Sequence, residues 1–204
     1  MSDISRAGFF AMNAHRGQQR KFAKEPYMKH PLRVASLVAS ILACYEPMKL
    51  RSERGRDMVK AALLHDTLEY TSTTCEKIRE LFGEGTASMV QELTSDEERV
   101  DKMKQELGKV EGKARYFSGK MKGISSDALL IKLADRADNL QDIRNVWSGA
   151  DDFIEEYTKE TKIIIEEIRE RVMCESKAHQ ILFERIIDSV KRLSWRIIFS
   201  GKNR

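Results

Sequence analysis

A histidine and an aspartate stand side by side at the end of an apolar run, and a glutamate follows closely. His65 and Asp66 come directly after Ala61–Leu64, and Glu69 lies four residues after the histidine and three after the aspartate. On a helix these offsets place Glu69 on the same face as both residues. Burying ionisable groups is costly unless something compensates, and a metal ion is the usual compensation. The segment therefore predicts a patch that binds a metal or activates water.

A second segment, residues 130–140, places an aspartate beside an apolar stripe. The stripe repeats at helical spacing; Asp135 adjoins it, and Asn139 follows four residues later on the same side. A lone aspartate in such a place is usually a boundary residue or the partner of a local arginine. The His-Asp pair elsewhere in the chain makes Asp135 a candidate ligand as well.

The chain has four histidines, and three of them have ordinary structural explanations. His179 lies in a polar stretch and is expected to be exposed. His15 ends the first predicted helix, where a protonated imidazole suits the helix dipole. His30 directly precedes Pro31 at the start of a predicted helix, and by itself it would also be structural.

Together, four residues resemble the ligand pattern of the HD phosphohydrolases. His30 is followed by the adjacent pair His65 and Asp66 and then by the distant Asp135. Two imidazoles and two carboxylates leave open positions on a divalent ion such as Mn²⁺, Fe²⁺ or Zn²⁺. Such an ion acidifies water, which becomes a nucleophile near neutral pH. The resemblance implies a metal-dependent phosphohydrolase.

Longer motifs resemble the hydrolase domain of RelA/SpoT-type alarmone enzymes. The matching stretches are residues 14–21, 26–35, 61–71 and 132–140. A chain of 204 residues leaves no room for a synthetase or regulatory domain, so the expected likeness is to the stand-alone small alarmone hydrolases. This resemblance implies Mn²⁺-dependent removal of the 3′-pyrophosphate of (p)ppGpp, with another divalent metal as the alternative.

The same resemblance assigns roles to further residues. Glu69 is expected to orient or deprotonate the attacking water. A guanidinium can stack on a purine and a lysine can reach a phosphate, which suits a basic pair at the nucleotide. The residues expected at the nucleotide are Arg20 and Lys21 as the basic pair, Tyr27 and Asn139 at the base and ribose, and Tyr157 as a C-terminal wall, with the lysines of 102–113 near the pyrophosphate entrance.

Position 70 departs from the pattern of the hydrolase-competent members. These carry Glu-Asp where this chain has Glu69 and Tyr70, and in the family that aspartate works with the glutamate in catalysis. A tyrosine has an unperturbed pKa of about 10 and is no base at neutral pH, although it can donate a hydrogen bond to a phosphate or a leaving oxygen. Three outcomes stay open: slower turnover with Glu69 alone, a changed nucleotide substrate such as NADPH or an adenine alarmone, or nucleotide binding without turnover.

The charge distribution leaves one further alternative, a helical nucleic-acid binder. The net charge is only +4, but residues 101–122 and the C-terminal stretch are rich in lysine and arginine. These stretches lack interleaved aromatics or a docking motif, so no nucleic-acid partner is expected. A solvated helix face explains the first stretch, and a surface that attracts a polyanionic nucleotide is the alternative.

Nearly every element that positions these residues is predicted to be a helix. Apolar periodicity and caps favour an all-α, compact multi-helix fold with C-terminal helices packed on it. The resemblance implies that this is the HD-domain fold. The expected helices cover residues 5–15, 30–45, 55–68, 73–83, 85–93, 128–143, 151–173 and 176–199, and residues 97–120 are expected to form a charged helical segment interrupted by glycines. We expect residues 1–160 to form the HD hydrolase domain and residues 161–204 a C-terminal helical extension.

Composition favours a cytoplasmic protein. Apolar residues make up 41% and charged residues 33% of the chain. The three cysteines show no pairing pattern, which argues for a reducing compartment. The longest nearly apolar stretch, residues 34–45, is too short to span a bilayer, so no membrane contact is expected. The metal, the exact nucleotide and a homo-oligomeric state are left open.

Overall fold

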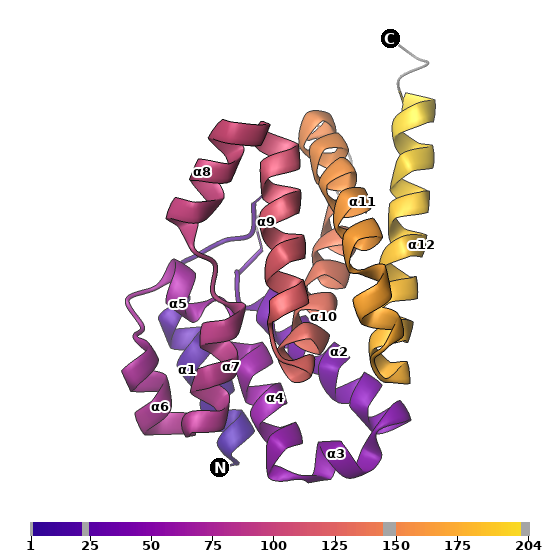
Figure 1. Cartoon of the computed structure of the whole chain (residues 1–204). Helices are drawn as coiled ribbons and strands as arrows, with labels where there is room; N and C mark the ends of the chain where they lie inside the picture. Colours follow the sequence, from indigo (N-terminus) through magenta and orange to yellow (C-terminus); the bar gives the residue numbers. More distant parts are fainter. Residues whose placement is uncertain (1, 22–24, 145–149, 201–204) are drawn as a thin grey trace. The chain divides into compact units, whose positions relative to one another are not determined.

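The computed structural model describes residues 2–21, 25–144 and 150–200, and every regular element in these ranges is a helix (Figure 1). This confirms the predicted all-α fold class. The chain divides into two compact units, which are described separately: residues 1–94 with 124–138, and residues 95–123 with 139–204. The domain boundary expected at residue 160 stays a prediction.

In the first unit, one buried helix is the centre of the packing. The helix α4 packs against α1, α2, α3 and α7, and α6 packs against α7. Gly55 lets α3 approach α4 closely, since a Cβ there would lie 2.0 Å from the main-chain oxygen of Lys49. The helices of this unit are α1 (Asp3–Ala14), α2 (Lys29–Tyr45), α3 (Pro47–Arg51), α4 (Glu53–Leu64), α5 (Thr67–Tyr70), α6 (Cys75–Phe82), α7 (Glu84–Leu93) and the first part of α10 (Ser126–Arg144).

The helix expected over residues 55–68 is split at the His-Asp pair. Helix α4 ends at Leu64, and the short α5 begins at Thr67. The hydroxyl of Thr67 donates to the main-chain oxygen of Leu64 at 2.7 Å and so takes one of the carbonyls that end α4. His65 and Asp66 therefore lie at a junction between two helices, where their side chains can point into the unit.

The second unit consists of α8 (Glu97–Leu107), α9 (Lys109–Gly123), α11 (Asp151–Met173), α12 (Lys177–Ser200) and the end of α10. Helix α9 packs against α8 and α11, and α12 packs against α11 (Figure 1). The helical segment expected over 97–120, with interrupting glycines, forms two helices, because Gly108 adopts φ +87° and ends α8. Gly112 then allows close contact, since a Cβ there would lie 2.3 Å from the main-chain oxygen of Met103.

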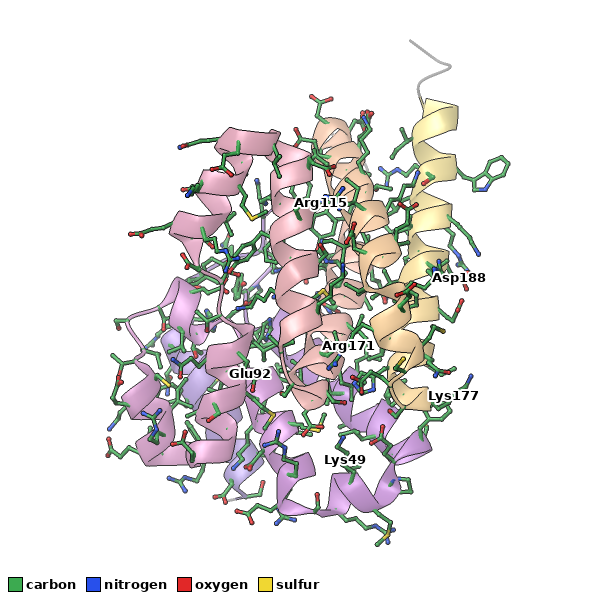
Figure 2. All side chains as sticks on the ribbon, viewed as in Figure 1. Lys49, Glu92, Arg115, Arg171, Lys177 and Asp188 are labelled. Atoms are coloured by element: carbon green, nitrogen blue, oxygen red, sulfur yellow. The ribbon has the colours of Figure 1, made fainter. Side chains whose placement is uncertain are left out.

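Basic side chains of residues 101–122 pair with carboxylates of the same unit. Arg115, labelled on α9 in Figure 2, bonds Glu111 and Glu167, and Lys122 lies 2.6 Å from Glu167. Lys104 and Lys109 likewise pair with Asp101 and Glu156. Much of the positive charge of this stretch is therefore neutralised locally.

One expectation for the second unit is wrong. His179 is fully buried, with 0% exposure, and its Nδ1 lies 2.9 Å from the hydroxyl of Ser176. Its helix turns this position inward, which the polar composition of the stretch concealed. In the described part of the chain, no helix has both the length and the apolar character that crossing a bilayer requires.

Candidate metal centre

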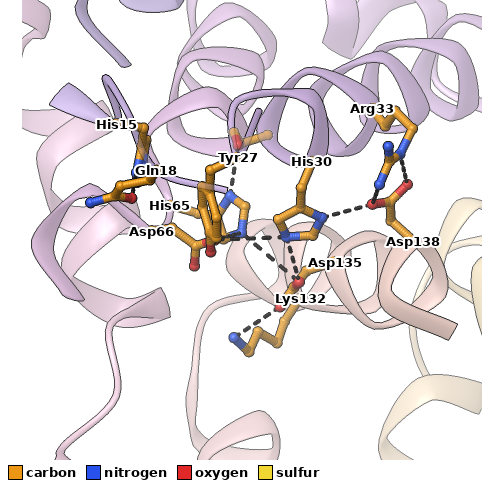
Figure 3. A network of polar contacts seen from close by, with 11 residues as sticks. His15, Gln18, Tyr27, His30, Arg33, His65, Asp66, Lys132, Asp135 and Asp138 are labelled. Carbon is orange, nitrogen blue, oxygen red and sulfur yellow. Dashed lines mark hydrogen bonds and ion pairs between the residues drawn. The ribbon is translucent and has the colours of Figure 1, made fainter. Parts of the chain in front are cut away.

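The structure brings the four predicted ligands together within the first unit (Figure 3). His30 comes from the first turn of α2, His65 and Asp66 from the junction of α4 and α5, and Asp135 from α10. Ligand atoms of the first three all lie within 4.8 Å of one another. Nε2 of His30 is 3.2 Å from Oδ1 of Asp135 and 3.7 Å from Oδ2 of Asp66, and all four residues are buried.

An aspartate that the sequence interpretation missed fixes the orientation of His30. Nδ1 of His30 donates to Oδ2 of Asp138 at 2.7 Å, because a carboxylate only accepts. Arg33 donates to both oxygens of Asp138, at 2.7 and 2.9 Å. Nε2 of His30 is thereby directed toward the other two carboxylates. The signal in the sequence was the spacing, since Asp138 follows Asp135 by three residues on one helix.

His65 is oriented by the main chain instead. Its Nδ1 donates to the main-chain oxygen of Ala62 at 2.9 Å. Its Nε2 is buried and makes no hydrogen bond within the described part of the chain, although it lies 3.1 Å from Oδ2 of Asp66. A buried nitrogen without a hydrogen bond is costly unless a ligand occupies the space it faces. This nitrogen has the surroundings expected of a metal ligand.

The two carboxylates also have outer partners. The hydroxyl of Tyr27 donates to Oδ2 of Asp66 at 2.6 Å, and Nζ of Lys132 lies 3.0 Å from Oδ2 of Asp135. Metal ligands in proteins are usually held in this way by a second layer of hydrogen-bonding groups. Because every predicted ligand has such a partner, the donor set fits a divalent cation.

The electrostatics of the site favour positive charge. Burial alone would lower the pKa of His65, but the charges of Asp66 and Asp135 outweigh it and raise the pKa of His65 to about 9. Burial opposes ionisation of both aspartates, yet the facing imidazoles, together with Lys132 beside Asp135, hold the pKa of each carboxyl below its usual range. Protons and a metal ion therefore compete for the same nitrogens.

Glu69 and Tyr70, the predicted catalytic pair, lie on α5, which begins directly after the predicted ligand Asp66. Glu69 is half-buried, and its charge helps Asp135 to raise the pKa of Lys132 against the effect of burial. Tyr70 is 53% exposed, and its ring contacts that of Tyr27 edge to face, with centroids 6.0 Å apart. The acidic side chain thus lies within electrostatic reach of the site.

The predicted nucleotide contacts fall into both units. In the first unit, Cζ of Arg20 lies 5.5 Å from the ring centroid of Tyr27, and Lys21 is exposed. Asn139 on α10 and Tyr157 on α11 are half-buried residues of the second unit, which also contains the lysines of 102–113. The roles given to these residues stay predictions.

His15 differs from its expected role as a charged end of α1. It is only 3% exposed, and burial lowers its pKa, so the ring is uncharged at neutral pH. Its Nδ1 bonds the amide oxygen of Gln18 at 2.8 Å, and its ring stacks on Tyr27 with centroids 4.8 Å apart. The helix-dipole explanation was wrong because the residue packs inward.

Comparison with known proteins places the chain among related hydrolases. The HD-domain family matches residues 7–171. A Danio rerio protein named guanosine-3′,5′-bis(diphosphate) 3′-pyrophosphohydrolase MESH1 is 31% identical, over 86% of this chain and 90% of its own. An Aquifex aeolicus protein of the same enzyme name is 33% identical over 83% of this chain, and Escherichia coli SpoT is 34% identical over 68%.

These relatives differ in how much of their own length this chain covers. The chain spans about a fifth of the Aquifex and Escherichia proteins, 21% and 18% of their lengths. A solved structure, titled as a metazoan ortholog of SpoT that hydrolyzes ppGpp, superposes with a TM-score of 0.65 at 26% identity and covers 94% of this chain and 96% of its own. This chain therefore belongs to the HD-domain family, with homology to SpoT-type hydrolase domains and to the stand-alone MESH1 hydrolases.

Proposed function

We propose that this chain is a metal-dependent guanosine-3′,5′-bis(diphosphate) 3′-pyrophosphohydrolase. The observation that carries the proposal is the convergence of two buried imidazoles and two buried carboxylates, each held by an outer partner. Homology over most of the chain to a Danio rerio protein of that name supports the substrate. The three cysteines are free, which suits the cytoplasmic location that we also propose.

We assign the metal to Nε2 of His30, Nε2 of His65 and one oxygen each of Asp66 and Asp135. This mixed set of nitrogen and oxygen donors suits Mn²⁺, and other divalent ions accept the same donors. When bound, the ion supplies Lewis acidity and lowers the pKa of water toward neutrality. Tyr27, Lys132 and Asp138 hold the ligands and take no part in the bond changes.

We assign Glu69 as the general base. In the reaction, a water oxygen forms a bond to the phosphorus that is attached to the ribose 3′ oxygen, and the bond between this phosphorus and the 3′ oxygen breaks. The 3′ oxygen takes up a proton, and pyrophosphate leaves. Glu69 accepts the proton that the water gives up, a task that its charge and its place on α5 beside Asp66 support.

We assign the nucleotide to the side chains that the family motifs indicate. Arg20 presents a guanidinium that can stack on a purine, and Lys21 an ammonium that can reach phosphate. Tyr27, Asn139 and Tyr157 complete the proposed contacts. All five remain assignments from the family motifs.

A second candidate is hydrolysis of a different nucleotide, and Tyr70 favours it. A tyrosine stands where hydrolase-competent relatives are expected to carry a second carboxylate, so the phosphate surroundings of this chain differ. NADPH, at its 2′-phosphate, and an adenine alarmone are the alternative substrates. A catalytically weak nucleotide-binding module is the remaining alternative.

The test is a substrate panel with Mn²⁺-loaded protein and a chelated control. We expect pyrophosphate from ppGpp, pppGpp and ppApp, with ppGpp used best, and no product after chelation. Faster turnover of NADPH than of ppGpp would replace the first candidate with the second. Binding of ppGpp in calorimetry, with no product formed over hours, would support the remaining alternative, a nucleotide-binding module.

A further inference from the structure

The segment between α1 and α2 contacts the metal centre through Tyr27 (Figure 3) and α5 through Gln18. The hydroxyl of Tyr27 donates to Oδ2 of Asp66 at 2.6 Å, just before α5 begins. The side-chain amide of Gln18 donates to the main-chain oxygen of Tyr70 at 2.7 Å, where α5 ends. Both ends of α5 are therefore bonded to side chains of one segment.

Helix α5 depends on such outside contacts. It has only four residues, and its amide of Tyr70 donates back to the main-chain oxygen of Asp66 at 3.1 Å. One turn of helix does not persist by itself in water. The carbonyl of Tyr70 lies at the C-terminal end of this helix, where Gln18 supplies a donor to it. The position of Glu69, the residue before Tyr70, is consequently set by groups outside its own helix.

The orientation of Gln18 is fixed by simple hydrogen-bond logic. A main-chain oxygen only accepts, so the amide nitrogen of Gln18 faces Tyr70 and its amide oxygen faces His15. His15 therefore carries its proton on Nδ1. Its Nε2 is buried without a hydrogen bond in the described part of the chain, so Gln18 is the polar contact that orients this ring.

The oriented ring of His15 stacks on the ring of Tyr27 and so restricts the orientation of Tyr27. The two rings lie 4.8 Å apart at an interplanar angle of 30°. The carboxylate of Asp66 only accepts, so the hydroxyl of Tyr27 is the donor in the bond between them. Gln18, His15, Tyr27 and Asp66 thus form one continuous series of contacts.

We propose that Tyr27 and Gln18 are positioning residues: Tyr27 fixes the carboxylate of Asp66 for the metal, and Gln18, oriented by His15, fixes the end of α5 that carries Glu69. The catalytic consequence rests on the proposed function. The effects on metal binding and on α5 do not, so they can be measured without any substrate.

Tyr27→Phe tests the first half, because it keeps the stacked ring and removes only the hydroxyl. The readout is the Kd for Mn²⁺, measured by titration without nucleotide. Loss of an outer partner typically weakens metal binding by about 10- to 100-fold, and we expect a rise in Kd of that size. Tyr45→Phe is the matched control, since Tyr45 is 45% exposed at the end of α2. A Tyr27→Phe protein that folds and binds Mn²⁺ with the wild-type Kd would overturn this half.

Gln18→Met tests the second half, because it keeps the side-chain length and removes both hydrogen bonds. The readout is hydrogen exchange of the amides of residues 66–71, which we expect to speed up about tenfold as α5 opens more often. Gln105→Met, on the exposed face of α8, is the control. Unchanged exchange in α5 would overturn this half.

Activity then separates positioning from general destabilisation. At saturating Mn²⁺, a displaced Glu69 lowers kcat while KM stays within about twofold, because the base acts in the transition state. A Gln18→Met protein that retains the wild-type kcat would contradict the catalytic consequence. Should wild-type protein release no pyrophosphate from ppGpp, the proposed function fails, and the Mn²⁺ titration and hydrogen exchange still decide the positioning roles.

Discussion

Replacing Asp138 with asparagine tests whether the metal centre depends on the orientation of His30. The carboxylate accepts from Nδ1 of His30 and from two nitrogens of Arg33, all within 2.9 Å, and Asp138 is 6% exposed. An asparagine has one acceptor and one donor end in the same volume. Either way it turns, its amide nitrogen meets another donor, from His30 or from Arg33.

The expected magnitude follows from these contacts. A hydrogen bond to a charged group contributes about 1.5–3 kcal/mol, and the side chain of Arg33 is 37% exposed, so it can turn to water. We therefore expect Asp138→Asn to lower the free energy of unfolding by about 2 kcal/mol. Because a neutral amide oxygen accepts more weakly than a carboxylate, His30 is held less firmly, and the Kd for Mn²⁺ should rise by about 10- to 100-fold.

Two measurements on the same protein check this prediction: a Mn²⁺ titration and urea unfolding. Asp188→Asn is the matched control, because Asp188 on α12 is exposed and its contact with Lys191, at 3.6 Å, is weak (Figure 2). Wild-type Mn²⁺ affinity in Asp138→Asn would refute the claim that Asp138 orients a metal ligand. A fall in affinity of equal size in Asp188→Asn would point to an unspecific charge effect.

Three further substitutions test other parts of the structure. Asp127→Asn should cost about 2 kcal/mol of unfolding free energy at pH 7, since Lys49 lies 2.6 Å from Asp127. Despite burial, bonds to basic partners hold the pKa of Asp127 below 3.8. The difference in unfolding free energy between wild type and Asp127→Asn, measured in urea, therefore has its full size above pH 3.8 and shrinks as the pH falls further. A difference that does not change with pH would contradict this. Gly112→Ala should lower the free energy of unfolding by about 2 kcal/mol in thermal unfolding, because its Cβ would meet a main-chain oxygen of α8. Gly119→Ala, whose Cβ would meet no described atom within 4 Å, should leave it unchanged. Tyr70→Asp should raise kcat on ppGpp by up to about 10²-fold if position 70 limits general acid–base catalysis, and an unchanged kcat would show that it does not.

The proposed ligands could be predicted because their chemistry is local and their family spacing is specific. An adjacent His-Asp pair after an apolar run identified His65 and Asp66, and the family pattern then selected His30 and Asp135. The structure brings these four residues together. The helical character of the chain could be predicted as well, since apolar periodicity and capping residues are local signals.

The outer partners were harder to predict, because they depend on contacts between distant segments. Gln18 and Tyr70 are 52 positions apart, and Tyr27 and Asp66 are 39 apart. Nothing near Gln18 in the sequence indicates its partner. The burial of His15 and His179 was missed for a related reason: a polar neighbourhood in the sequence does not say which way a helix turns one side chain. Asp138 is the exception, because its spacing from Asp135 was visible.

The central claim is tested most directly by pyrophosphate release from ppGpp, followed with Mn²⁺-loaded wild-type protein beside His65→Ala. His65 supplies a buried Nε2 that makes no hydrogen bond among the described residues, so its loss removes one proposed ligand and leaves the nucleotide side chains in place. We predict release of pyrophosphate by the wild type and none by His65→Ala. Equal release by both proteins, or no release by the wild type at any divalent metal or pH, would contradict the account.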